Sequence, residues 1–182
     1  MTSLVIVTDI DLLTLTHRTD VFEYYSVGHD EPDTLFKTNM KGAIKRGRSA
    51  FFMGGIGDGR HLYTTLMTLS GYEVQQGEKA SEKKYHFTIN DLKPHAIARD
   101  LLVLMILEEI AQAFPKSCAL GKSEELFSTV YYIFIAPCMP AYAYEILQGK
   151  ITKLLDALQG NEALPAAFDV PMMYRASLIK VL

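Results

Sequence analysis

Four glycines lie within six residues of one another, where a short apolar run, 51–53, meets a helix-compatible segment, 60–69. Three of them, Gly55, Gly57 and Gly59, are spaced as Gly-x-Gly-x-Gly. Glycine at a strand–turn–helix junction lets a ligand reach bare backbone and permits positive φ. The first N–H groups of the helix have no partner inside it and can bind ligand oxygens. The spacing predicts a site for a nucleotide-like ligand, with a ligand-free glycine turn as the alternative.

This spacing differs from the Gly-x-Gly-x-x-Gly typical of dinucleotide sites. It resembles the first motif of class I methyltransferases, which bind S-adenosylmethionine (SAM). The resemblance implies that Gly55, Gly57 and Gly59 approach the amino-acid end of the cofactor. Asp58 lies inside the turn, where it either contacts the ligand or stabilises the turn through its own backbone.

A carboxylate follows the next expected strand. Asp91 ends the alternating segment 85–91 and can accept hydrogen bonds from ribose hydroxyls. The alternative is that it caps the helix that begins nearby, and one residue can do both. Gly55 and Asp91 are 36 positions apart (91 − 55), against about 20 in a simple unit, so the polar segment 72–84 is expected to loop out.

A third loop is the candidate for holding a methyl acceptor. Pro137, Met139 and Tyr142 follow the strongly apolar segment 127–135, and they echo the Asn/Asp-Pro-Pro-Tyr of enzymes that methylate nitrogen. The polar first residue of that pattern is missing, and no general base is evident. We therefore assign no catalytic residue, and interpret Cys138 as a buried, inert thiol rather than a nucleophile.

Two residues at the start of the expected helix could also do chemistry. Arg60 could hold a carboxylate, although such a residue is more often simply solvated, and an acid or base role for His61 is the less favoured interpretation of that residue. The remaining histidines are not spaced as metal ligands are, so we expect no metal site.

Composition narrows the class of protein. The chain of 182 residues is 49% hydrophobic, enough to bury a substantial core, and its net charge of −3 gives no nucleic-acid signal. Its two cysteines fit a reducing compartment, and we expect a cytoplasmic protein without a signal peptide or membrane span. The apolar C-terminus suggests a fragment of a longer chain.

The elements that must position these residues alternate along the chain. Strands are predicted at 50–53, 85–91 and 127–135, and residues 1–16 form a strand or a short helix. Helices are predicted at 60–69, with a stop at Gly71, and at 94–114. A further helix is predicted to end at a Gly160 cap, and the last helix to begin at an Asp169 cap. This order predicts a single α/β domain over 1–182: a Rossmann-like, mostly parallel sheet with helices on both faces, class I methyltransferase-like and possibly incomplete.

Longer segments carry a family resemblance. Residues 54–66, 86–102 and 139–147, with the entry segment 22–28, resemble a domain of unknown function common in fungi. That domain occurs alone or beside MYND-type zinc fingers, and a relative forms the N-terminal part of dynein axonemal assembly factor three. The resemblance covers most of 22–158 and implies a methyltransferase-like sheet. Met53 stands where methyltransferases often carry an acid, and the chain is short for their seven strands.

These observations support two hypotheses of different classes. The first is a SAM-binding domain that transfers a methyl group to an unknown acceptor, for which alignment of the reactants supplies much of the rate. The second is a non-catalytic protein-interaction or assembly module. In that case the apolar helix 94–114 or the C-terminus contacts a partner protein or a second copy.

Overall fold

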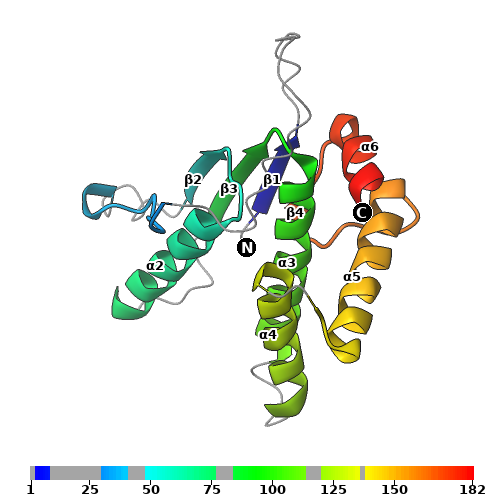
Figure 1. Ribbon diagram of the computed structural model, residues 1–182. Helices are drawn as coiled ribbons and strands as arrows, with labels where there is room; N and C mark the ends of the chain where they lie inside the picture. The colour runs from blue at the N-terminus through cyan, green and yellow to red at the C-terminus, as the bar shows by residue number, and fades with distance from the viewer. Residues whose placement is uncertain (1–2, 9–29, 41–47, 77–83, 114–119, 136–137) are drawn as a thin grey trace.

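A small parallel sheet forms one side of the molecule (Figure 1). The computed structural model describes residues 3–8, 30–40, 48–76, 84–113, 120–135 and 138–182. The strands are β1 (Ser3–Thr8), β2 (Arg48–Gly54), β3 (Lys84–Asp91) and the two-residue β4 (Phe168–Asp169), in the order β2-β3-β1-β4. The predicted strand before the glycine turn and the predicted strand that ends at Asp91 are both confirmed, and they are direct neighbours in the sheet.

Five α-helices and one short 3-10 helix make up most of the described residues. They are η1 (Thr38–Met40), α2 (Arg60–Gln76), α3 (Pro94–Ala113), α4 (Leu120–Ile135), α5 (Ala141–Gln159) and α6 (Met172–Val181). None of the described helices has the length and apolar character needed to cross a bilayer.

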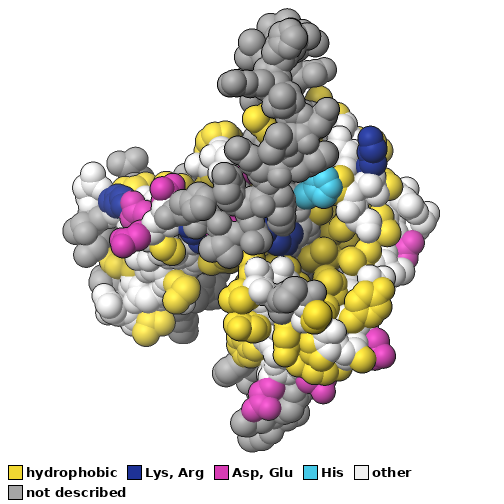
Figure 2. Space-filling view, in the orientation of Figure 1, with side chains coloured by type: hydrophobic (Ala, Val, Ile, Leu, Met, Phe, Trp, Pro, Cys, Tyr) yellow, Lys and Arg dark blue, Asp and Glu magenta, His cyan; other side chains and the backbone are white. Residues whose placement is uncertain are grey.

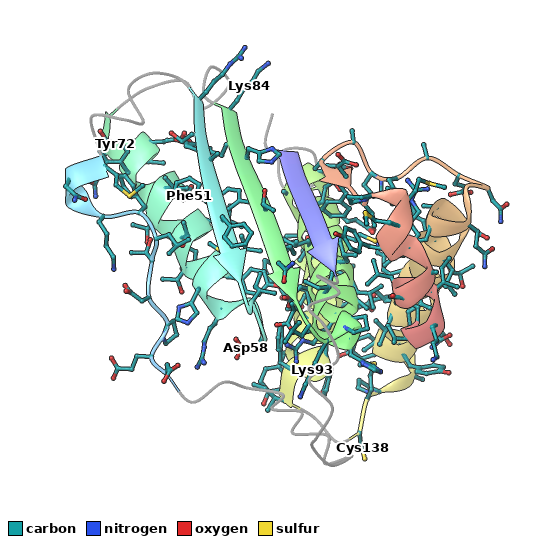
Figure 3. The ribbon with its side chains drawn as sticks, turned by 90° about the horizontal axis from the view of Figure 1, so that it is seen from above. Phe51, Asp58, Tyr72, Lys84, Lys93 and Cys138 are labelled. Carbon is teal, nitrogen blue, oxygen red and sulfur yellow. The ribbon has the colours of Figure 1, made fainter. Side chains whose placement is uncertain are left out.

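The sheet buries one face. Along β2 and β3, buried residues alternate with more exposed ones, so that Phe51 stacks on Phe87 in the core at 4.9 Å while Phe52 is 65% exposed. Helices α2 and α3 both lie behind the strands in Figure 3, and Leu62 and Leu101 bring them into the same core. The prediction of a Rossmann-like sheet with helices on both faces is therefore wrong. Helix dominates the described chain, the sheet is small, and its strands alternate as half-buried strands do.

The segment predicted as the strongest strand, 127–135, belongs to helix α4. Its inner side packs Leu126, Val130 and Ile133 against α3, and its outer side exposes Tyr131 and Ile135. A helix that is apolar on two sides gives a continuous apolar run, which periodicity cannot distinguish from a buried strand. The third predicted sheet loop, 136–142, consequently follows a helix and not a strand.

Helix α2 is longer than predicted because Gly71 does not end it. The helix runs on to Gln76, so residues 72–76, which the sequence analysis assigned to the loop 72–84, belong to the helix. Tyr72 is buried and its ring packs on Phe36 at 5.2 Å, so tertiary contact extends the buried stripe beyond the glycine. Glycine weakens a helix interior without forbidding it.

Of the two helix caps predicted near the C-terminus, one is confirmed and the other is wrong. Gly160 caps α5 in the left-handed region, with φ 87°, as predicted. Asp169 was expected to cap the last helix, but it lies in β4, paired with Val5, and Pro171 precedes α6 instead.

Helix α3 lies at the centre of the molecule. It has buried residues on all sides and contacts β3, β1, α4, α5 and α6. The burial that the sequence assigned in part to a partner is thus supplied, among the described residues, by the chain's own elements. Residues from Phe36 to Leu178 share one core, while the extent of the domain over 1–182 stays a prediction.

Candidate functional site

The glycine turn joins the end of β2 to the start of α2. Gly55, Gly57 and Gly59 have φ of 67°, 57° and 70°, a region that side chains with a Cβ rarely adopt. Between them, Ile56 is buried and its N–H donates to the carbonyl oxygen of Asn90 at 3.1 Å. The glycines are therefore required by the path of the backbone, and one apolar anchor fixes the turn to the neighbouring strand.

Asp91 meets the glycine turn directly. Its Oδ2 accepts the N–H of Gly57 at 2.8 Å, and its Oδ1 accepts the N–H of Lys93 at 2.8 Å. The predicted convergence of the turn with the carboxyl end of β3 is therefore present, and Figure 3 shows Asp58 and Lys93 at that same end of the sheet. The carboxylate also fastens the start of α3, as the capping interpretation predicted, so both oxygens that were expected to face a ribose already hold backbone N–H groups.

A buried cluster that the sequence analysis missed lies beneath the turn. A Cβ on Gly59 would stand 2.8 Å from the Tyr63 ring and 2.9 Å from Asp100 Oδ1. Asp100 is fully buried, and Tyr63 Oη donates to its Oδ1 at 3.4 Å. Within the described part of the chain, its other oxygen, Oδ2, has no hydrogen-bond partner. The signal in the sequence was an Arg-Asp pair, 99–100, inside the otherwise apolar stretch 96–107.

Burial controls the ionisation of this cluster. It raises the pKa of Asp100 to about 8, and the nearby Asp58 adds to that rise while Arg99 opposes it. Burial, followed by the charge of Asp100, likewise raises the pKa of Tyr63. At neutral pH the Asp100 carboxyl is therefore protonated, because a desolvated charge is more costly than a neutral acid.

Arg99 connects α3 to the turn from below. Its Nη2 donates to the carbonyl oxygen of Gly57 at 2.9 Å, and its guanidinium lies 5.1 Å from the centre of the Phe134 ring. Gly57 is thus held on both sides, by Asp91 through its N–H and by Arg99 through its carbonyl. The turn is therefore fastened both to the end of β3 and to α3.

The polar residues of the turn are also engaged. Asp58 is 8% exposed, and its Oδ1 lies 3.4 Å from Arg60 Nε and 3.3 Å from the Arg60 backbone nitrogen. Arg60 reaches the Asp30 carbonyl as well, and the His61 ring accepts the Asp33 N–H at 3.0 Å. These contacts fit the stabilising interpretation of Asp58 and tie segment 30–40 to α2.

A hollow of about 330 Å³ lies on the outer side of the turn, lined by Gly54, Gly55, Phe52, His61 and Lys37. Its volume is at the lower end of small-molecule pockets, which run from about 300 to 1,000 Å³. At its rim Lys37 pairs with Asp33 at 2.6 Å, and this lowers the pKa of that carboxyl.

Of the acceptor-loop candidates, Met139 and Tyr142 do not line the hollow beside the glycine turn. Tyr142 Oη is 3.0 Å from Ser128 Oγ, which ties the start of α5 to α4, and Met139 lines a separate cavity beside α3. Pro137 lies outside the described residues. Cys138 is exposed, contrary to the burial expected for it.

Comparison with known families places the chain. A family model described as a domain of unknown function, DUF4470, matches residues 14–135, which include the glycine turn, Asp91 and the buried cluster. This chain belongs to the DUF4470 family. Searches of curated proteins and of solved structures give no match. The family carries no assigned activity, so the expected relations to methyltransferases and to the dynein assembly factor stay predictions.

Proposed function

We propose that this DUF4470 chain is a protein-interaction module, and that it associates with a second copy of itself through the outward side of α4. The observation that carries the proposal is a stripe formed by Phe127, Tyr131 and Ile135. These side chains are 49%, 55% and 60% exposed and follow one another at intervals of four residues. That spacing puts them on one side of the helix. Adjacent exposed apolar groups of this size mark contact surfaces.

The surroundings of the stripe extend it. Tyr144, at the start of α5, is 55% exposed, and Figure 2 shows hydrophobic side chains gathered over α4 and α5. A two-fold contact needs a surface that is complementary to itself. An uncharged apolar stripe meets this need, because apolar side chains pack against their own copies without like-charge repulsion.

The glycine turn supports the same proposal. The backbone groups that would meet a cofactor are partly used inside the chain: the Gly57 N–H is bound by Asp91 and the Gly57 carbonyl by Arg99. The positive φ of the three glycines accounts for the motif without a ligand. On this account the turn is a structural junction, and contact with a partner is the function.

Sedimentation velocity over a series of protein concentrations tests the proposal. We expect the wild-type chain to pass from monomer to dimer as its concentration rises, and Tyr131→Lys to remain monomeric because it places a charge in the contact. Val74→Lys is the matched control, since Val74 is 77% exposed on α2, outside the stripe. A wild-type chain that stays monomeric throughout, or a Val74→Lys variant that dissociates equally well, contradicts the proposal.

The second candidate is a SAM-binding domain that transfers a methyl group to an unknown acceptor. The observation that favours it is the hollow beside Gly54 and Gly55, where a Cβ on Gly55 would meet open space. Calorimetric titration with S-adenosylhomocysteine tests it. Heat that disappears in a folded Asp91→Ala variant would favour this candidate, and no heat from the wild-type chain would remove it.

Two further inferences follow the same line. We infer a cytoplasmic location, because the chain has only two cysteines and Cys138 is a free thiol. The resemblance to the N-terminal part of dynein axonemal assembly factor three suits a role in assembly better than a role in chemistry.

A further inference from the structure

Strand β2 forms one edge of the sheet, with β3 between it and β1 (Figure 1). Within the described part of the chain, no backbone hydrogen bond joins the far side of β2 to another segment. Alternate residues of a parallel strand point their N–H and C=O groups away from the paired neighbour. The far side of β2 therefore presents a row of backbone donors and acceptors that can pair with a further strand.

The two edges of the sheet differ in how they are protected. Folded proteins protect sheet edges with very short strands, proline or charge. At the opposite edge, β4 has only two residues. Strand β2 has seven residues, contains no proline, and carries its single charge on its first residue, Arg48. Of the two edges, β2 is therefore the one suited to accept another strand.

Charge at the start of the sheet favours one kind of added strand. Arg48 and Lys84 are register partners on β2 and β3, both are exposed, and neither has an ion-pair partner among the described residues. Figure 3 shows Lys84 at the end of the sheet opposite to Asp58. Paired like charges repel, so a carboxylate beside Arg48 on an added strand would offset that repulsion. Because β2 contains no acidic residue, a second copy of β2 would not supply this carboxylate.

The outward face of β2 offers an apolar contact as well. Phe52 lies four residues after Arg48, on the same face of the strand, and is 65% exposed. The hollow of about 330 Å³ is lined by Phe52, by Gly54 and by residues of segment 30–40. A large side chain on an added strand would therefore pack on the Phe52 ring and find room beside it.

We propose that the edge of β2 binds an extended segment of a partner protein, which adds a strand to the sheet. The segment would carry an acidic side chain beside Arg48 and, four residues away, an aromatic or β-branched side chain beside Phe52. In this mode main-chain pairing provides affinity and the side chains provide specificity. The proposal does not rest on dimerisation, because β2 and the stripe of α4 are different elements, and Tyr131→Lys should bind the segment as the wild type does.

Fluorescence anisotropy with a labelled peptide, GTFTVTETG, tests the proposal. An antiparallel strand of this sequence places its phenylalanine, valine and glutamate beside Phe52, Ala50 and Arg48. We expect saturable binding that is about fivefold tighter than that of GTFTVTKTG, whose lysine would add a third positive charge. No saturable binding, or equal affinity for the two peptides, overturns the proposal.

Two variants of the protein locate the site. Arg48→Glu should reverse the preference between the peptides, because the nearest charge changes sign, and Phe52→Ser should weaken binding of both. Lys153→Glu is the matched control, since it makes the same change of sign at an exposed position of α5. Circular dichroism confirms that each variant is folded. A preference for the glutamate peptide that persists in folded Arg48→Glu, or that reverses in Lys153→Glu, contradicts the assignment.

N-methylation of the peptide distinguishes strand pairing from non-specific apolar contact. An N-methyl group removes one backbone donor, and alternate residues of a strand face opposite edges. Methylation of the alternate residues that face β2 should abolish binding, whereas methylation of the other alternate set should leave it intact. Equal effects of the two sets would show that the peptide does not bind as an added strand.

Discussion

Single atoms decide the character of the glycine turn. The N–H of Gly57 points to Asp91 Oδ2, and the space beside Gly59 is filled by Tyr63 and Asp100. The three glycines of the motif are therefore required for different reasons. Gly55 has positive φ and open space, whereas Gly59 has positive φ and no room for a Cβ.

Gly59→Ala should be much more destabilising than Gly55→Ala. A left-handed residue with a Cβ costs about 1–2 kcal/mol, which applies to both variants. At Gly59 the added methyl also meets Tyr63 and Asp100 at under 3.0 Å, and overpacking of this kind costs about 1–3 kcal/mol more. Urea unfolding of the two variants measures the difference. Equal losses of stability in the two variants would show that Tyr63 and Asp100 leave room for a Cβ at position 59.

Asp100 should make the protein less stable as pH rises. Its carboxyl has an ordinary pKa of 3.8 and a pKa of about 8 in the folded chain. Between these values the unfolded chain loses the proton while the folded chain keeps it, so the free energy of unfolding falls by up to about 1.4 kcal/mol per pH unit. Below the ordinary pKa of 3.8, the contribution of Asp100 to the free energy of unfolding is constant. Above the folded-state pKa of about 8, that contribution has been lost completely.

Urea midpoints of the wild type and of Asp100→Asn, compared at the acidic and alkaline ends of that window, isolate this contribution. The neutral amide cannot titrate, so the variant should lack the part of the pH dependence that comes from Asp100. Parallel curves for the two proteins would mean that Asp100 is ionised in the folded state.

At the scale of elements, the sequence specified most helices and strands but not their limits. Local signals were sufficient where they were strong: Pro94 opens α3 and Gly160 closes α5. They failed at Gly71, where the buried Tyr72 continues the helix, and over 127–135, where two apolar sides imitate a strand. The first failure comes from a tertiary contact, which a local pattern does not contain. The second comes from an exposed apolar side that completes a continuous apolar run.

Gly71→Ala should stabilise the protein, because Gly71 lies inside α2 and a Cβ there would meet open space. Alanine in an exposed helix interior gains about 0.5–1 kcal/mol over glycine. Gly160→Ala is the contrasting variant, since its φ of 87° should make the same change destabilising. Thermal melting of both variants checks the signs. A loss of stability in Gly71→Ala would indicate that the helix stops at the glycine.

At the scale of the whole molecule, the sheet is small and its helices carry most of the core. The sequence predicted that the glycine turn meets Asp91, because adjacent parallel strands end at the same edge. It could not predict that Asp91 binds the turn itself, since that depends on side-chain direction. Nor could it place Arg99, Asp100 and Tyr63 together, because they come from two helices separated by β3.

The central claim is that the glycine turn is a closed junction held by Asp91, and not an open cofactor slot. Backbone amide signals of ¹⁵N-labelled protein test it directly during titration with S-adenosylhomocysteine. If the turn is closed, the amide signals of Gly55, Gly57, Gly59 and Lys93 keep their positions even at the highest ligand concentration. Saturable shifts of these signals, absent in a folded Asp91→Ala variant, would contradict it.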